Sequence, residues 1–67
     1  MKVYILIEGT EDGDYINAVA LSLEGAKAAH TRPGTWQDSP DGGARFLLAG
    51  RHNVPPSVRI EVHEVRP

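Results

Sequence analysis

Carboxylate side chains are concentrated in one short polar segment near the start of the chain: Glu8, Glu11, Asp12 and Asp14. The last two flank a glycine and resemble part of a calcium-binding loop. Such a loop ends in a glutamate that binds the ion through both oxygens, but Ser22 and Leu23 occupy the region where that residue should fall. We therefore expect a solvated turn. The functional alternative is an acidic protrusion that docks onto a basic protein surface.

Three histidines raise the question of a metal site: His30, His52 and His63. They fall on an expected helix end, a loop and a strand, and their spacing matches neither a helical pair nor a zinc-protease motif. Each has an ordinary structural role, at a helix C-terminus, in solvent or on a polar sheet face. We expect no metal ion and no cofactor.

General acid–base chemistry would centre on His52, between Arg51 and Asn53. It requires a partner carboxylate and a pocket, and the sequence identifies neither. The chain has no cysteine, no serine in a Gly-x-Ser-x-Gly turn and no phosphate-binding glycine loop. We predict that the protein is not an enzyme.

Trp36 is the single tryptophan, and two roles are open to it. It would complete the small core, which is the commoner role for a large aromatic side chain. It would alternatively anchor a protein interface, where tryptophan is enriched. We include it with the four carboxylates as a candidate partner-binding residue.

Size and charge limit the classes of function. The chain has 67 residues, which suits a single domain over residues 1–67, and its formal net charge is −2. Nucleic-acid binding usually depends on a basic excess, so we do not expect it. The longest apolar run is far shorter than the ~20 residues of a membrane span, and we expect a cytoplasmic protein without membrane association. Because so small a core gives limited stability, a homodimer is an open option.

The first strand is the clearest structural signal. Residues 3–7 are uninterrupted apolar residues, mostly β-branched or aromatic, which favours an interior strand buried on both faces. The polar segment 8–14 is predicted to be a hairpin connection. Residues 15–21 then form a second strand, paired antiparallel with the first.

A short helix and further strands follow. Ser22 suits the N-cap of an alanine-rich helix at 23–30, which a Pro-Gly pair terminates. Residues 44–50 and the alternating segment from Val58 onward are predicted strands, and a short edge strand at 35–38 is left open. The predicted fold class is α+β, with ββα followed by two or three strands and one helix packed on one face of an antiparallel sheet.

Four segments carry a resemblance: Met-Lys-Val-Tyr-Ile-Leu-Ile-Glu at 1–8, Ser-Leu-Glu-Gly-Ala-Lys at 22–27, the isolated Trp36 and Val-Arg-Ile-Glu-Val-His-Glu-Val at 58–65. Together they resemble a group of very small bacterial and phage-encoded proteins of ββαββ type. The resemblance implies the same order of elements and an accessory gene of mobile-element origin. It brings no known active site, and small phage proteins often bind and inhibit a host protein.

The leading hypothesis is a non-enzymatic protein-binding module, of phage or mobile-element origin, that inhibits a host protein such as a defence-system component. The first alternative is a self-assembling structural subunit in which the open sheet face or an edge strand pairs with another copy. A small metal-dependent enzyme is a further alternative. The predicted partner is a protein, and the predicted contact residues are Glu8, Glu11, Asp12, Asp14 and Trp36.

Overall fold

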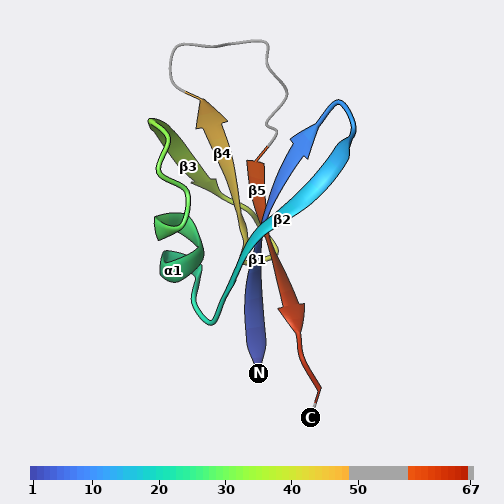
Figure 1. Cartoon of the computed structure of the whole chain (residues 1–67). Helices are drawn as coiled ribbons and strands as arrows, with labels where there is room; N and C mark the ends of the chain where they lie inside the picture. The colour runs from blue at the N-terminus through green and yellow to red at the C-terminus, as the bar shows by residue number, and fades with distance from the viewer. Residues whose placement is uncertain (49–57, 67) are drawn as a thin grey trace.

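Within residues 1–48 and 58–66, which the computed structural model describes, five antiparallel strands form one sheet in the order β2-β1-β5-β4-β3 (Figure 1). The elements are β1 (Lys2–Thr10), β2 (Gly13–Ala20), α1 (Leu23–Ala28), β3 (Gly34–Asp38), β4 (Ala44–Leu48) and β5 (Val58–Glu64). The prediction of a small antiparallel sheet with one short helix is confirmed. The end of the strand predicted over 44–50 lies outside the described residues.

β1 is an interior strand, hydrogen-bonded to β2 on one side and to β5 on the other. Leu6 faces α1 and is 1% exposed. On the opposite face Ile7 is buried, whereas Val3 and Ile5 are half-buried. The predicted burial on both faces therefore holds on the helix side and only partly on the other.

The β1–β2 turn is much tighter than predicted. β1 continues to Thr10 and β2 begins at Gly13, so only two residues form the turn. Thr10 Oγ1 donates to the Gly13 carbonyl at 2.8 Å and accepts from the Asp12 backbone N–H at 3.2 Å. The φ of Gly13 is +128°, a conformation that glycine adopts without strain. The polar connection predicted over 8–14 is wrong at both ends, because its first and last carboxylates belong to strands.

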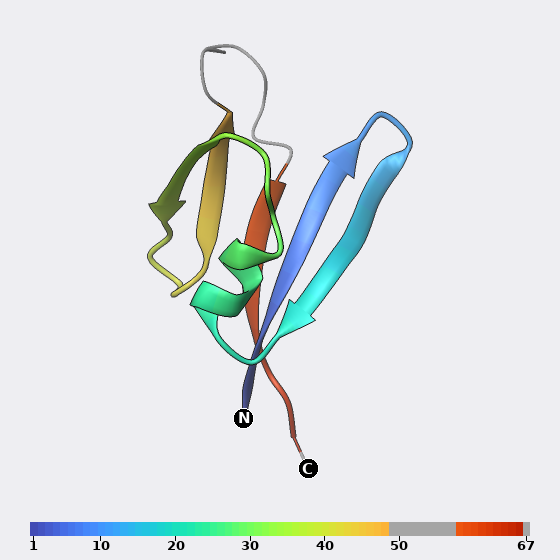
Figure 2. The same ribbon diagram turned by 60° about the vertical axis from the view of Figure 1, so that its left-hand side comes forward.

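The core lies between α1 and one face of the sheet. Its buried members are Leu6, Ala26, Ala44, Phe46, Val58 and Ile60. Half-buried side chains surround them: Tyr4, Ala18, Ala20, Leu23 and Trp36. Figure 2 shows α1 in front of the sheet, where it contacts β1, β2 and β5. A single short helix thus covers only the middle of this face.

The helix departs from its prediction in length and packing. Ser22 is the N-cap, and its Oγ accepts a hydrogen bond from the Gly25 N–H at 3.0 Å. α1 nevertheless ends at Ala28, and Ala26 is its only buried residue. His30 has left the helix, and its ring packs edge-on against Phe46 at 4.2 Å between centroids. Glycine and small side chains give this helix little to bury, so aromatic packing outweighs another helical turn.

Gly34 allows β3 to lie close against β4 and the Phe46 ring. A Cβ at this position would overlap the Phe46 ring and the Leu47 carbonyl. We expect Gly34→Ala to lower the free energy of unfolding by about 1–3 kcal/mol, because ring and strand must move apart. Urea denaturation measures the change. Thr35→Ala, at the exposed next position, should cost much less, and equal costs would contradict this packing.

The His30 imidazole is held in an apolar setting. Its Nε2 is buried and has no hydrogen-bond partner among the described residues. Burial lowers its pKa from the ordinary 6.5; Glu8 opposes this shift and Arg32 adds to it. The folded protein therefore favours the neutral ring.

This burial makes stability depend on pH. Well above pH 6.5 the ring is neutral in both the folded and the unfolded chain. As the pH falls through 6.5, the unfolded chain binds the proton before the folded protein does. We therefore expect the free energy of unfolding to fall as pH decreases from 6.5, until the lower folded pKa has been passed. Denaturant titrations on either side of 6.5 test this. His30→Phe should remove most of the fall, whereas His63→Gln should keep most of it.

Candidate functional site

One face of the sheet carries no helix or strand over it within the described residues. On β1 and β2 this face presents an aliphatic patch made of Val3, Ile5, Ile7, Ile16 and Val19. The ladder places Ile7 opposite Ile16 and Ile5 opposite Val19. Ile16 and Val19 are 67% and 60% exposed. The other three side chains of the patch are half-buried or buried, so its exposed apolar area comes mainly from Ile16 and Val19. Exposed aliphatic side chains beside further apolar ones are typical of contact surfaces.

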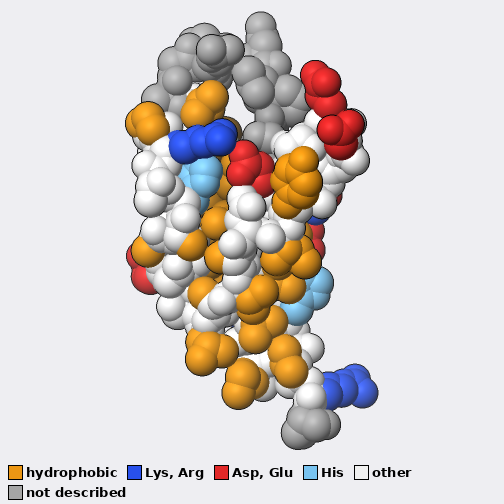
Figure 3. Space-filling model, viewed as in Figure 1, with side chains coloured by type: hydrophobic (Ala, Val, Ile, Leu, Met, Phe, Trp, Pro, Cys, Tyr) orange, Lys and Arg blue, Asp and Glu red, His pale blue; other side chains and the backbone are white. Residues whose placement is uncertain are grey.

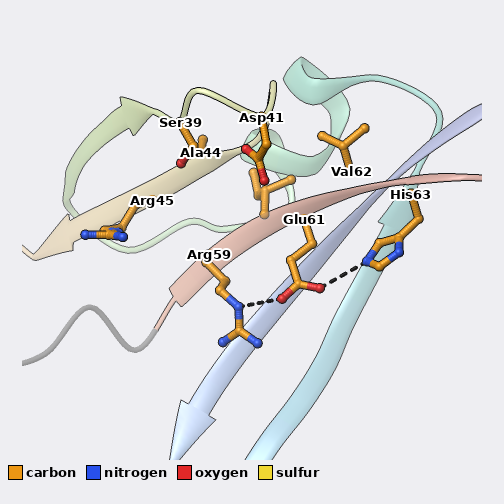
Figure 4. Close-up of a pocket in the computed structure, with 9 residues that line it drawn as sticks. Ser39, Asp41, Ala44, Arg45, Arg59, Glu61, Val62 and His63 are labelled. Atoms are coloured by element: carbon orange, nitrogen blue, oxygen red, sulfur yellow. Dashed lines mark hydrogen bonds and ion pairs between the residues drawn. The ribbon is translucent and has the colours of Figure 1, made fainter.

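A charged row borders the aliphatic patch on the same face. Arg59 Nη2 contacts Asp14 Oδ2 at 3.1 Å, and its Nε contacts Glu61 Oε2 at 2.7 Å. The other oxygen of Glu61 lies 3.0 Å from His63 Nε2. Figure 4 shows Glu61 between Arg59 and His63 along β5. The charged row is the set Asp14, Arg59, Glu61 and His63.

The opposite charges within the charged row are paired with one another. Hydrogen bonds from Arg59 and then His63 lower the pKa of Glu61 from its ordinary 4.5. Hydrogen bonds to Glu61 and Asp14 raise the pKa of Arg59 further above its usual range. A partner therefore gains little by neutralising these groups again.

Arg45 is the cation on this face that the row leaves out. It lies directly opposite Arg59 in the β4–β5 ladder, an arrangement of like charges that is unfavourable by itself. Asp14 and Glu61 neutralise Arg59, whereas Arg45 has no ion pair within the described residues. Arg45 is thus available to an acidic group from outside.

An open hollow of about 350 Å³ lies beside the charged row. It forms because β4 pairs with β5 only at Ala44–Ile60 and Arg45–Arg59, so the later part of β5 extends past β4. Its lining residues are Ser39, Asp41, Ala44, Arg45, Arg59, Ile60, Glu61, Val62 and His63. Ser39 lies across the hollow and away from His63 (Figure 4). His63 is hydrogen-bonded to Glu61 alone among the described residues, so no nucleophile and base come together here.

The four predicted carboxylates occupy three different settings. Glu8 is half-buried on the helix side, where its carboxylate accepts from Asn17 Nδ2 at 2.7 Å and pairs with Arg32 at 3.3 Å. Asp14 belongs to the charged row. Glu11 and Asp12 are exposed at the hairpin turn, without an ion pair inside the described chain. Acidic side chains are visible together at this tip in Figure 3.

Trp36 lies on the helix side of β3 and is half-buried. Its ring packs edge-on against Phe46 at 5.1 Å and against His30 at 5.7 Å between centroids. These contacts fit the core role. Its role in partner binding stays a prediction.

Sequence reasoning missed the charged row as a unit, although part of its signal was present. The alternation of β5 places Arg59, Glu61 and His63 on one face. Their connection to Asp14 depends on strand order, because β1 separates β2 from β5. The aliphatic patch likewise requires knowing which face the helix covers.

Compared with protein-family models, curated proteins and solved structures, the chain matches none of them. The resemblance to small phage-encoded proteins therefore stays a prediction. Within residues 1–48 and 58–66, no group of three histidine, cysteine or acidic side chains is arranged to hold a metal ion. No helix in the described part of the chain has the length and apolar character to cross a membrane. The cluster around His52, at 51–53, lies outside the described residues.

We expect Arg59→Gln to raise the pKa of Glu61 towards 4.5, because Glu61 loses its main hydrogen bond. The stability lost should stay below about 1 kcal/mol, since both side chains are half-exposed and solvent screens their interaction. In the wild type this contribution is present above the unfolded pKa and is lost as pH falls below it. Nuclear magnetic resonance titration of the Glu61 carboxyl gives the pKa. Arg45→Gln should leave it unchanged, and an ordinary value in the wild type would contradict the ion pairing.

Proposed function

We propose that this chain is a non-enzymatic protein-binding module that contacts its partner through the β1–β2 hairpin and the open sheet face. The observation that carries the proposal is the exposure of β2. Its residues from Gly13 to Asn17 are all exposed, and Ile16 and Val19 are among the most exposed aliphatic side chains described. An apolar surface that the fold leaves open is favourable to bury against another protein.

The charges indicate the chemistry of the partner. Glu11 and Asp12 extend the hairpin with two carboxylates that have no cation beside them within the described residues. At the other side of the open face, Arg45 offers a positive charge. The complementary surface is an apolar depression with basic groups near the hairpin tip and an acidic group near β4.

The same surface partly supports the hypothesis, drawn from the sequence, that the protein inhibits a host protein by binding it. An acidic tip beside an aliphatic patch suits a protein that covers a basic site on its target, as an inhibitor of a host factor would do. Inhibition of a host protein and phage origin remain part of the proposal. Cytoplasmic location is also proposed.

Affinity capture with matched variants tests the proposal. The tagged wild type is incubated with lysate of the cell that produces it, and bound proteins are identified by mass spectrometry. We expect a protein that Ile16→Ser, and separately the Glu11→Gln/Asp12→Asn double variant, capture several-fold less efficiently. These residues are exposed, so the variants should fold, and circular dichroism checks this.

The controls carry the same chemistry elsewhere. Leu48→Ser removes an aliphatic side chain of similar exposure from the helix side of β4, away from the open face, and Glu24→Gln removes a carboxylate from α1. Both should capture the protein as the wild type does. Equal capture by every variant, or no captured protein at all, would overturn the proposed binding surface.

A further inference from the structure

β2 is an uncovered edge of the sheet. It ends the strand order, and within the described residues no strand pairs with its outer side (Figure 2). Its eight residues include no proline and no lysine, which commonly protect such edges. α1 contacts β1, β2 and β5 over one face of the sheet and does not run along the outer side of β2 (Figure 2). The unpaired backbone groups of β2 are therefore able to accept another strand.

β2 carries one charged residue, Asp14, and is interrupted by a bulge. The ladder changes register between Leu6, opposite Ala18, and Ile7, opposite Ile16, so Asn17 is an extra residue. The Asn17 side chain hydrogen-bonds to Glu8 and thus lies on the helix side. β2 therefore has two consecutive residues on the helix side and open-face residues on either side of them.

This interrupted alternation between the two faces limits which strand is able to pair with β2. A regular strand alternates at every residue, so it fits β2 on one side of the bulge and is out of phase on the other. An antiparallel second copy carries the same phase change. With Ile16 opposite Val19 of the second copy, Asn17 falls opposite Ala18 and Tyr15 opposite Ala20, and both members of each pair lie on the same face. A shift of one or two residues breaks this match, for example by placing Ile16 opposite Asn17.

Charge favours the same arrangement. The carboxylates of the hairpin gather at one end of β2, at Glu11, Asp12 and Asp14. A parallel copy would bring these groups together, whereas an antiparallel copy places them at opposite ends of the joint. No carboxylate then faces another across the pair.

We propose that two copies of this chain associate through antiparallel pairing of their β2 edges, with the two-fold axis between Asn17 and Ala18. The two sheets become one continuous sheet, and the two aliphatic patches lie side by side on the same face. Ile16 and Val19 contact each other across the joint while remaining available to a partner. This inference does not depend on the proposed function.

Cysteine pairing tests the register, because the natural chain has no cysteine. Ile16→Cys is mixed under mild oxidation with a Val19→Cys variant that carries a size tag. We expect the mixed disulfide dimer to form several-fold faster than in a mixture of Tyr15→Cys and Val19→Cys, whose side chains face opposite sides. Equal rates in the two mixtures would overturn the register.

The mass of the unmodified protein tests the association itself. Sedimentation equilibrium should give twice the chain mass of 7.3 kDa as concentration increases. A monomer over the whole accessible range would overturn the proposal. A monomer that still captures a partner through its hairpin refutes only the dimer. A dimer whose capture ignores the hairpin substitutions refutes only the proposed function.

Discussion

The joint between β1, β5 and β4 is the constraint on which the rest of the structure depends. β5 pairs with β1 along its whole length but with β4 at only two positions, Ala44–Ile60 and Arg45–Arg59. Within the sheet, the β1–β2 and β3–β4 hairpins are therefore joined through this single strand. Gly43 sits so close to the Ile60 carbonyl that any side chain there would collide with the backbone of β5. Core packing and the hollow beside β4 both follow from how β5 bridges the two hairpins.

A chain this short covers one face of its sheet and leaves the other. The single helix buries Ala26 and shields the middle of the core, whereas Ile16 and Val19 stay exposed on the far side. The charged row gives the open face a polar side around Arg59, next to the aliphatic patch. The division between the two faces thus separates residues that hold the fold from residues that the fold leaves exposed.

The sequence predicted local features well and failed where distant segments meet. The apolar run at 3–7, the N-cap at Ser22 and the alternation from Val58 are properties of neighbouring residues, and all three appear in the structure. The helix end was wrong because His30 gains from aromatic rings on β3 and β4, which local composition does not reveal. The acidic cluster was predicted as one unit, but tertiary ion pairs divide it. The salt bridge of Asp14 to a strand two places away in the sheet required the strand order.

The edge-on contact between His30 and Trp36 gives the protein a built-in optical reporter. The chain has only one tryptophan, so its tryptophan emission comes from a single known position. An imidazole at 5.7 Å, between ring centroids, is close enough to quench that emission when it gains a proton. We therefore expect the intensity of tryptophan emission to follow the charge of this half-buried imidazole, without any attached dye. A rearrangement of the packed rings around Trp36 should therefore change the tryptophan fluorescence of the native chain.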